Sequence, residues 1–302
     1  MAEIVLHHYP RSLYAEKVRR VLAYKRIRWR SVEQPMMSPK PELAPLTGGY
    51  RRVPVMQIGA DVYCDSACIL RRLEALHPEP ACLPPAEAEI VGLAEDWADR
   101  RLVSLVMPPT VLALLPVLPP DILVDRAAMS PMLSKEAFAT LAPAALRQAP
   151  FAFDRLERLL RDRPFILGDA FSLADAACFH PLWFARSCPE LAAAIDARPA
   201  LGRWMARIEG FGPGNVRPMA CSEALAIARE SEPADVAGGA TVVAGLSVGD
   251  DVMITADDYG REGTAGNVVR LAADEITIRR RDPELGDLAV HFPRAGYRIQ
   301  RQ

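Results

Sequence analysis

Ser12, Asp65 and Ser66 are the residues best placed to do chemistry, because each stands just ahead of a predicted helix. Tyr14 and Val18 begin an apolar helical stripe directly after Ser12. The N-terminus of a helix attracts anions, since its unpaired N–H groups and its dipole are positive there. In such surroundings the pKa of a thiol falls from ~8.5 to ~3.5–7.5. A hydroxyl at Ser12 could therefore help to hold a thiolate.

Other interpretations of these residues stay open. Ser12 could serve as a helix cap and nothing more, and the same holds for Asp65 and Ser66, because Ser and Asp are preferred capping residues. Tyr9 or Tyr14 could supply the hydroxyl in place of Ser12.

The elements around Ser12 predict how it is positioned. Residues 4–8 read as a buried strand, and a turn that ends at Ser12 leads from it into the helix. A second strand is expected over residues 27–32. The chain therefore opens as a β-α-β unit.

A predicted hairpin follows Val53 and Pro54. Its strands cover residues 55–58 and 62–64, and a short turn beginning at Gly59 separates them. Pro54 has a fixed φ and no N–H, so the chain must turn tightly before it, and a cis bond is one way to do so. Such a bend can leave the N–H and C=O of Val53 facing outward, where a peptide could pair with them as an added strand.

This order of features resembles the thioredoxin-like half of the glutathione transferase family: Val-Pro, a hairpin, an acid-Ser pair and a helix. Ser12 followed by residues 17–19, Lys-Val-Arg, is similar to the pattern of the serine-type members. The resemblance implies that glutathione is a co-substrate and lies extended along Val53. It also implies that Asp65 and Ser66 hold the γ-glutamyl end and that Ser12 hydrogen-bonds the thiolate.

The sequence departs from the commoner family pattern at two positions. Leu13 stands where many serine-type members have Pro, and Asp65 stands where many have Glu. Arg52 stands where the family often has a basic residue near the carboxylate of the ligand, and its planar fork suits that role. Arg52 could instead be a solvated surface charge beside Arg51.

Residues 85–230 are expected to be all-helical. A helix that starts at Glu87 should break near residues 107–109, Met-Pro-Pro, and be followed by irregular or short helical structure. Another helix is expected over residues 146–161, with a kink or a late start at Pro150. The later part of this helical region is expected to contain further helices, near residues 199–209 and 222–229.

Ser172 and Asp175 have the spacing of a capping box at the start of another helix in this region. In glutathione transferases the same segment begins a buried core helix, so the resemblance assigns Asp175 a folding role and no catalytic one. His180 and Trp183 on that helix read as core or interface residues.

The composition changes again at Ala237. Gly238 and Gly239 read as a linker, and short alternating runs follow it. The strands expected there cover residues 252–255, 266–271, 275–280 and 288–292. We expect a small SH3-like β-barrel, which is not part of the usual two-domain plan of the family; docking or stabilising a dimer is a plausible role.

Composition and charge limit the possible partners. Residues 1–80 carry 13 Lys and Arg against 8 Asp and Glu, which suits an anionic small ligand. The run Arg279-Arg280-Arg281 reads as a solvated strand edge, because its region is net acidic and poor in aromatic residues, so we expect no nucleic acid. No apolar run approaches the ~20 residues that span a bilayer, and no signal peptide is evident, so we expect no membrane and a cytoplasmic location. The six cysteines have no zinc spacing and read as reduced thiols, so no metal is expected.

The sequence therefore predicts a multidomain protein of α/β, all-α and small all-β parts. These are a thioredoxin-like domain over residues 1–80, a helical domain over 85–230 that would hold an electrophile, and the β-barrel over 240–302. We expect an enzyme that transfers the glutathione thiolate to an electrophilic small molecule, and the resemblance implies a homodimer. A non-enzymatic interaction module, or a glutathione-dependent lyase or peroxidase, is the alternative.

Overall fold

The computed structural model describes residues 3–234 and 245–302, which form two compact units. The first unit contains the chain up to Ala15, Arg28–Arg72 and the part from Val216 onward, and the second contains Glu16–Ile27 and Leu73–Asn215. The predicted linker at Gly238 and Gly239 lies outside the described residues.

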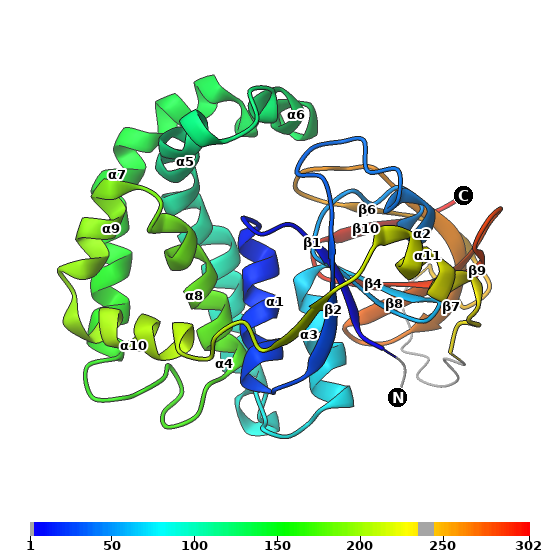
Figure 1. Ribbon diagram of the computed structural model, residues 1–302, viewed down its shortest axis with the longest axis horizontal. Helices are drawn as coiled ribbons and strands as arrows, with labels where there is room; N and C mark the ends of the chain where they lie inside the picture. The colour runs from blue at the N-terminus through cyan, green and yellow to red at the C-terminus, as the bar shows by residue number, and fades with distance from the viewer. Residues whose placement is uncertain (1–2, 235–244) are drawn as a thin grey trace. The chain divides into compact units, whose positions relative to one another are not determined.

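The first unit is built on a thioredoxin-like sheet. β1 pairs in parallel with β2 and antiparallel with β3, and β3 pairs antiparallel with β4 (Figure 1). This arrangement confirms the β-α-β unit and the hairpin expected from the sequence. The elements up to residue 76 are β1 (Val5–His8), α1 (Leu13–Tyr24), β2 (Arg28–Glu33), α2 (Ala44–Thr47), β3 (Val55–Ile58), β4 (Asp61–Cys64) and α3 (Ser66–Leu76). Most of α1 and the end of α3 are counted with the second unit.

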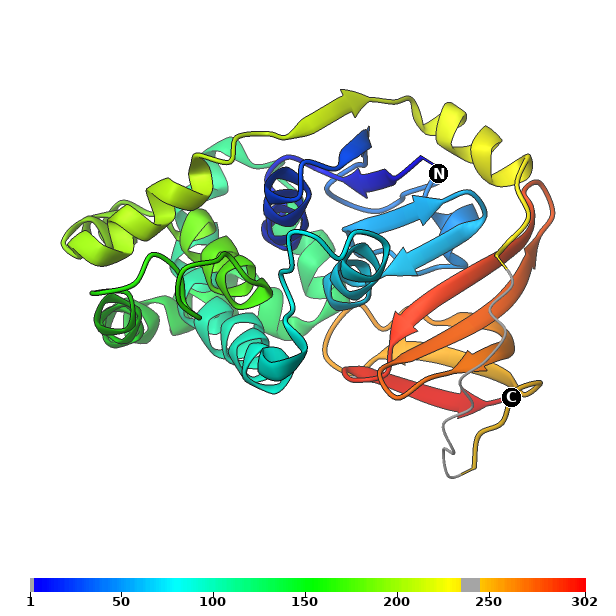
Figure 2. The same cartoon turned by 90° about the horizontal axis from the view of Figure 1, so that it is seen from below.

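The C-terminal region is a five-stranded antiparallel sheet with the order β10-β6-β7-β8-β9. The strands that come first and last in this part of the chain, β6 and β10, therefore lie side by side. A third, all-β region is thereby confirmed, although β10 was not predicted. The region also extends the thioredoxin-like sheet, because β9 pairs in parallel with β4 (Figure 2). Its strands are β6 (Asp251–Ala256), β7 (Thr264–Leu271), β8 (Glu275–Asp282), β9 (Gly286–Pro293) and β10 (Tyr297–Arg301).

A common hydrophobic core joins the β3–β4 hairpin to the C-terminal sheet. Val55 and Val62 of the hairpin belong to the same buried cluster as Val252, Ile278 and Val290 of the sheet. Burial of apolar area contributes roughly 25 cal/mol per Å². The C-terminal sheet is therefore packed onto the hairpin that carries the predicted ligand site.

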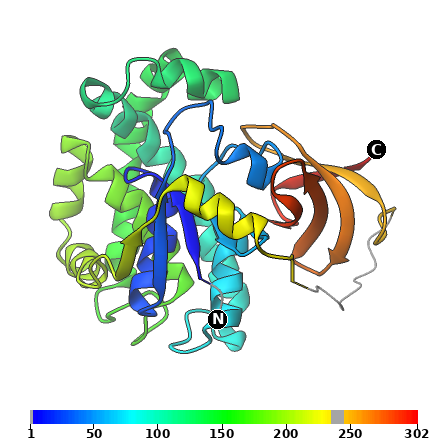
Figure 3. The same cartoon turned by 45° about the vertical axis from the view of Figure 1, so that its right-hand side comes forward.

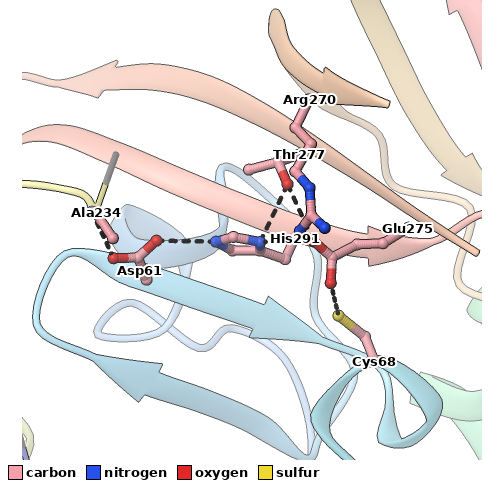
Figure 4. A network of polar contacts seen from close by, with 7 residues as sticks. All are labelled: Asp61, Cys68, Ala234, Arg270, Glu275, Thr277 and His291. Carbon is pink, nitrogen blue, oxygen red and sulfur yellow. Dashed lines mark hydrogen bonds and ion pairs between the residues drawn. The ribbon is translucent and has the colours of Figure 1, made fainter. Parts of the chain in front are cut away.

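A polar network inside the same unit reinforces this join. His291 of β9 lies between two carboxylates: its Nε2 is 2.9 Å from Asp61 Oδ1, and its Nδ1 is 3.2 Å from Glu275 Oε1 (Figure 4). Its ring stacks on Tyr63, with 4.2 Å between the ring centroids. Asp61 and Tyr63 lie on β4, so the network bridges the two parts of the sheet.

Helix α11 (Cys221–Arg229) also belongs to the first unit. It follows β5 (Asn215–Pro218), which is the neighbour of β2 in the sheet (Figure 3). Ala224 packs with Val5 and Val32 of the sheet in a small buried cluster. The sequence placed this helix with the helical region, but its apolar face is covered by the sheet.

The second unit is helical, and the break expected near residues 107–109 and the late start expected at Pro150 are both wrong. α5 continues through Pro108 and Pro109, and α7 starts well before Pro150 and runs through it. Buried apolar faces outweigh the lost hydrogen bonds, as tertiary packing often overrides local propensity. The helices of this region are α4 (Ala88–Asp96), α5 (Val103–Leu114), α6 (Ile122–Met129), α7 (Lys135–Leu159), α8 (Leu173–Ala185), α9 (Pro189–Asp196) and α10 (Pro199–Glu209), with a π-helical stretch at Trp97–Leu102.

The capping box at the start of α8 is confirmed. Ser172 Oγ accepts a hydrogen bond from Asp175 N, and Asp175 accepts one from Ser172 N. Asp175 also accepts from Trp204 Nε1 at 2.8 Å. His180 is buried and bonded to Asp99, which agrees with its interpretation as a core residue.

Among the residues that the structure describes, one helical stretch, Pro85–Val117, could cross a membrane by length and composition alone. This corrects the expectation that no segment is long enough. The core helix of a soluble protein passes the same test, so the observation is weak evidence for a membrane span.

Candidate functional site

The predicted ligand-binding residues lie at one end of the β3–β4 hairpin. Val55 pairs with Cys64, so the residues just before β3 and just after β4 are neighbours. The bond between Val53 and Pro54 is cis. Within the described residues, neither the N–H nor the C=O of Val53 has a hydrogen-bond partner. Both groups are therefore available to an extended ligand.

Ser12 lies at the same end of the sheet. β1 is antiparallel to β3, and His7 stands opposite Val55. The turn after β1, which contains Tyr9 and Ser12, therefore starts beside the turn that precedes β3. Tyr14 lies in the first turn of α1. The structure thus brings Ser12 and its two alternatives to the edge where Val53 and Pro54 lie.

Both capping interpretations are realised. Ser12 is 2% exposed, and its Oγ accepts a hydrogen bond from Ala15 N at 3.3 Å. Asp65 Oδ1 accepts one from Ala67 N at 2.9 Å at the start of α3. Neither bond uses all the capacity of the side chain, because a hydroxyl keeps its proton to donate and each carboxylate oxygen has a second lone pair.

Asp65 is held from a second side by the C-terminal sheet. Its φ is +78°, in the left-handed region that non-glycine residues seldom adopt. Its Oδ2 accepts a hydrogen bond from the hydroxyl of Tyr297 on β10 at 3.1 Å. Tyr50 lies 3.2 Å from that hydroxyl. Burial, and next the charge of Asp65, raise the pKa of both phenols well above the usual value, so both stay protonated and can pass a hydrogen bond toward Asp65.

Arg52 also contacts the C-terminal region. Its Nη2 forms an ion pair with Asp258 Oδ1, and its guanidinium lies 4.0 Å from the ring centroid of Tyr259. Burial raises the pKa of Tyr259 to about 12, so the ring is neutral at pH 7 and offers its face to the cation. Arg52 is thus not the freely solvated charge of the alternative interpretation.

The cysteines of the chain are free thiols, and all but the half-buried Cys221 are buried. All six cysteines are unpaired, which agrees with the interpretation as reduced thiols. Burial raises the pKa of Cys64 and Cys68 well above the usual value, so both thiols stay protonated at pH 7. Among the described residues, no group of three or more His, Cys, Asp or Glu side chains is arranged to hold a metal ion.

Comparisons with known proteins decide the family. The model of the glutathione S-transferase N-terminal domain matches residues 6–81, and that of the C-terminal domain matches residues 139–207. A GST-like protein from Pseudomonas syringae is 34% identical, with a TM-score of 0.83, and the match covers 100% of both chains. This chain belongs to the glutathione S-transferase family.

Other transferases share the fold at lower identity. A glutathione S-transferase from Rhodospirillum rubrum F11 is 21% identical, with a TM-score of 0.56, and the match covers 70% of this chain and 89% of that one. For glutathione transferase F2 from Populus trichocarpa the identity is 14% and the TM-score 0.54, and 70% of this chain and 94% of that one are covered. A search of curated proteins found no match. The match to the Pseudomonas syringae protein spans the whole chain, so it includes the C-terminal sheet of this transferase-family protein.

Sequence reasoning missed the residues that the C-terminal sheet adds to the site. None of Asp258, Tyr259 and Tyr297 was singled out from the sequence. Their contacts to Arg52 and Asp65 span more than 200 residues. No local pattern predicts such contacts; the pairing of β9 with β4 and the shared hydrophobic core bring these segments together.

Proposed function

We propose that this protein is a glutathione transferase of the serine type, which transfers the thiolate of glutathione to an electrophilic small molecule. The observation that carries the proposal is the backbone of Val53, whose N–H and C=O have no hydrogen-bond partner among the described residues, beside Asp65 and Ser66. The family supports glutathione as the co-substrate.

Each residue has a role in this proposal. The cysteine residue of glutathione pairs with the backbone of Val53 as an added strand. Asp65 accepts from the α-ammonium group, and Ser66 at the start of α3 binds the α-carboxylate. Ser12 donates its free hydroxyl proton to the sulfur, and the dipole of α1 stabilises the thiolate further.

The chemistry then needs little beyond a positioned thiolate. The sulfur attacks an electrophilic carbon, a C–S bond forms, and the electron pair leaves with the displaced group or stays on the adduct. Positioning and thiolate stabilisation supply the rate enhancement. We also propose a homodimer in the cytoplasm, on the family resemblance.

Titration of the bound thiol tests the proposal. The thiol pKa of glutathione bound to the protein, followed by thiolate absorbance, should lie below the ~8.5 of a free thiol. Ser12→Ala should raise it by about one unit. The matched control is Ser134→Ala, which removes a comparable cap, since Ser134 Oγ accepts from Ala137 N at 3.1 Å in the helical unit.

Three outcomes would count against the proposal. Glutathione could fail to bind, the bound thiol could keep its free pKa, or the two variants could change that pKa equally. A panel of electrophiles that includes an aromatic halide provides the second readout. Turnover should depend on Ser12 and not on Ser134.

A further inference from the structure

The loop between β6 and β7 lies against the two arginines that precede the cis proline. Arg51 Nη1 is 3.3 Å from Glu262 Oε1, and Arg52 Nη2 forms an ion pair with Asp258. Tyr259 covers the guanidinium of Arg52. An acidic loop from the C-terminal sheet therefore neutralises the basic edge that the sequence assigned to an anionic ligand.

The Arg52 side chain is held and largely covered. It is 12% exposed, whereas Asp258 is 52% exposed. Its Nε is buried and has no hydrogen-bond partner within the described residues. A carboxylate can bind the guanidinium fork through two nitrogens, and here Asp258 contacts Nη2.

The resemblance implies that Arg52 lies near a carboxylate of the ligand. In the proposed function Asp65 and Ser66 take the γ-glutamyl end, so the carboxylate left for Arg52 is the one at the glycine end. Because Asp258 already provides a carboxylate there, a ligand carboxylate must displace Asp258 or share Arg52 with it. The binding free energy that a ligand carboxylate adds is then only the difference between two similar ion pairs with Arg52. This difference is small. A ligand that has no charge at this end loses little by comparison.

We propose that Asp258 is a specificity-determining residue, which removes the preference of the site for a free carboxylate at the glycine end of the thiol peptide. The inference rests on the proposed function. The substrate class it names is γ-glutamyl thiol peptides whose carboxyl end is neutral, as an ester or amide, in addition to glutathione itself.

Calorimetry with glutathione and its glycyl ethyl ester tests the proposal on the full-length protein. Wild type should bind the two ligands within about threefold of each other. Asp258→Asn keeps the size of the side chain and removes its charge, so it should tighten glutathione about threefold to tenfold and leave the ester unchanged. Glu262→Gln, which removes the ion pair of Glu262 with Arg51, is the matched control and should leave the ratio unchanged.

A second variant identifies the residue that provides the gain. In the double variant Asp258→Asn with Arg52→Gln, the gain for glutathione should disappear, while Arg52→Gln alone should change the wild-type ratio by less than about twofold. Equal changes for both ligands, or weaker glutathione binding by Asp258→Asn, would overturn the role of Asp258. Binding of neither ligand by wild type would instead overturn the proposed function, and this inference with it.

Discussion

His291 joins the C-terminal sheet to the hairpin that carries the ligand site, and replacing it with Phe should weaken that join. The ring would still stack on Tyr63, but Asp61 and Glu275 would lose the imidazole between them (Figure 4). Removing one partner from a buried ion pair costs about 3–5 kcal/mol. His291 is 2% exposed, so we expect a loss in this range at pH 6.

The loss should depend on pH. Burial lowers the pKa of His291, but the hydrogen bonds and charges of Asp61 and Glu275 outweigh it and raise the pKa above 6.5. A raised histidine pKa stabilises the folded state fully below pH 6.5, and this stabilisation is lost as the pH rises through the raised value. The pKa of Glu275 is lowered, against the effect of burial, by His291 and Arg270. Its contribution is present above pH 4.5 and is lost as the pH falls through the lowered value.

Hydrogen exchange of the β9 amides at increasing urea concentrations measures this effect locally, which is needed because a chain with two compact units need not unfold in a single step. The difference between wild type and His291→Phe should be large at pH 6 and smaller at pH 9. Tyr63→Phe is the control, since it keeps the ring and should keep the pH dependence. A difference below about 1 kcal/mol, or one equal at both pH values, would refute the reasoning.

Three further predictions follow from buried contacts. Tyr297→Phe removes the hydroxyl that donates to Asp65, so the Kd for glutathione should rise about fivefold, with kcat unchanged, in calorimetry and steady-state kinetics; an unchanged Kd would show that the contact does not matter. Asp175→Ala leaves Trp204 Nε1 and other buried donors unpaired, and hydrogen exchange of the α8 amides at increasing urea concentrations should show a loss of about 3–5 kcal/mol; a loss below about 1 kcal/mol would count against it. Cys68 should not react with a thiol reagent in the folded protein at pH 8, because burial raises its pKa, and rapid labelling would contradict this.

Local chemistry made the N-terminal part predictable. The hairpin before Asp65, the cap at Ser12 and the capping box at Ser172 each depend on residues within a few positions of one another. Both partners of each interaction therefore lie within one short stretch of sequence, and the residue types there are enough to predict it. The cis bond at Pro54 follows from the same local reasoning.

Long-range packing made other features unpredictable. α5 passes through Pro108 because its apolar side chains are buried, and no window of sequence reports that burial. The parallel pairing of β9 with β4 joins segments more than 200 residues apart. The contacts of Asp258 and Tyr297 with the candidate site depend on that pairing, so they could not be predicted without the structure.

A crystal structure of the protein soaked with glutathione tests the central claim most directly. The tripeptide should pair with the N–H and C=O of Val53, its ammonium group should lie on Asp65, and its sulfur should be within about 3.5 Å of Ser12 Oγ. Glutathione bound elsewhere, or side chains of the protein itself filling the space beside Val53, would contradict the account.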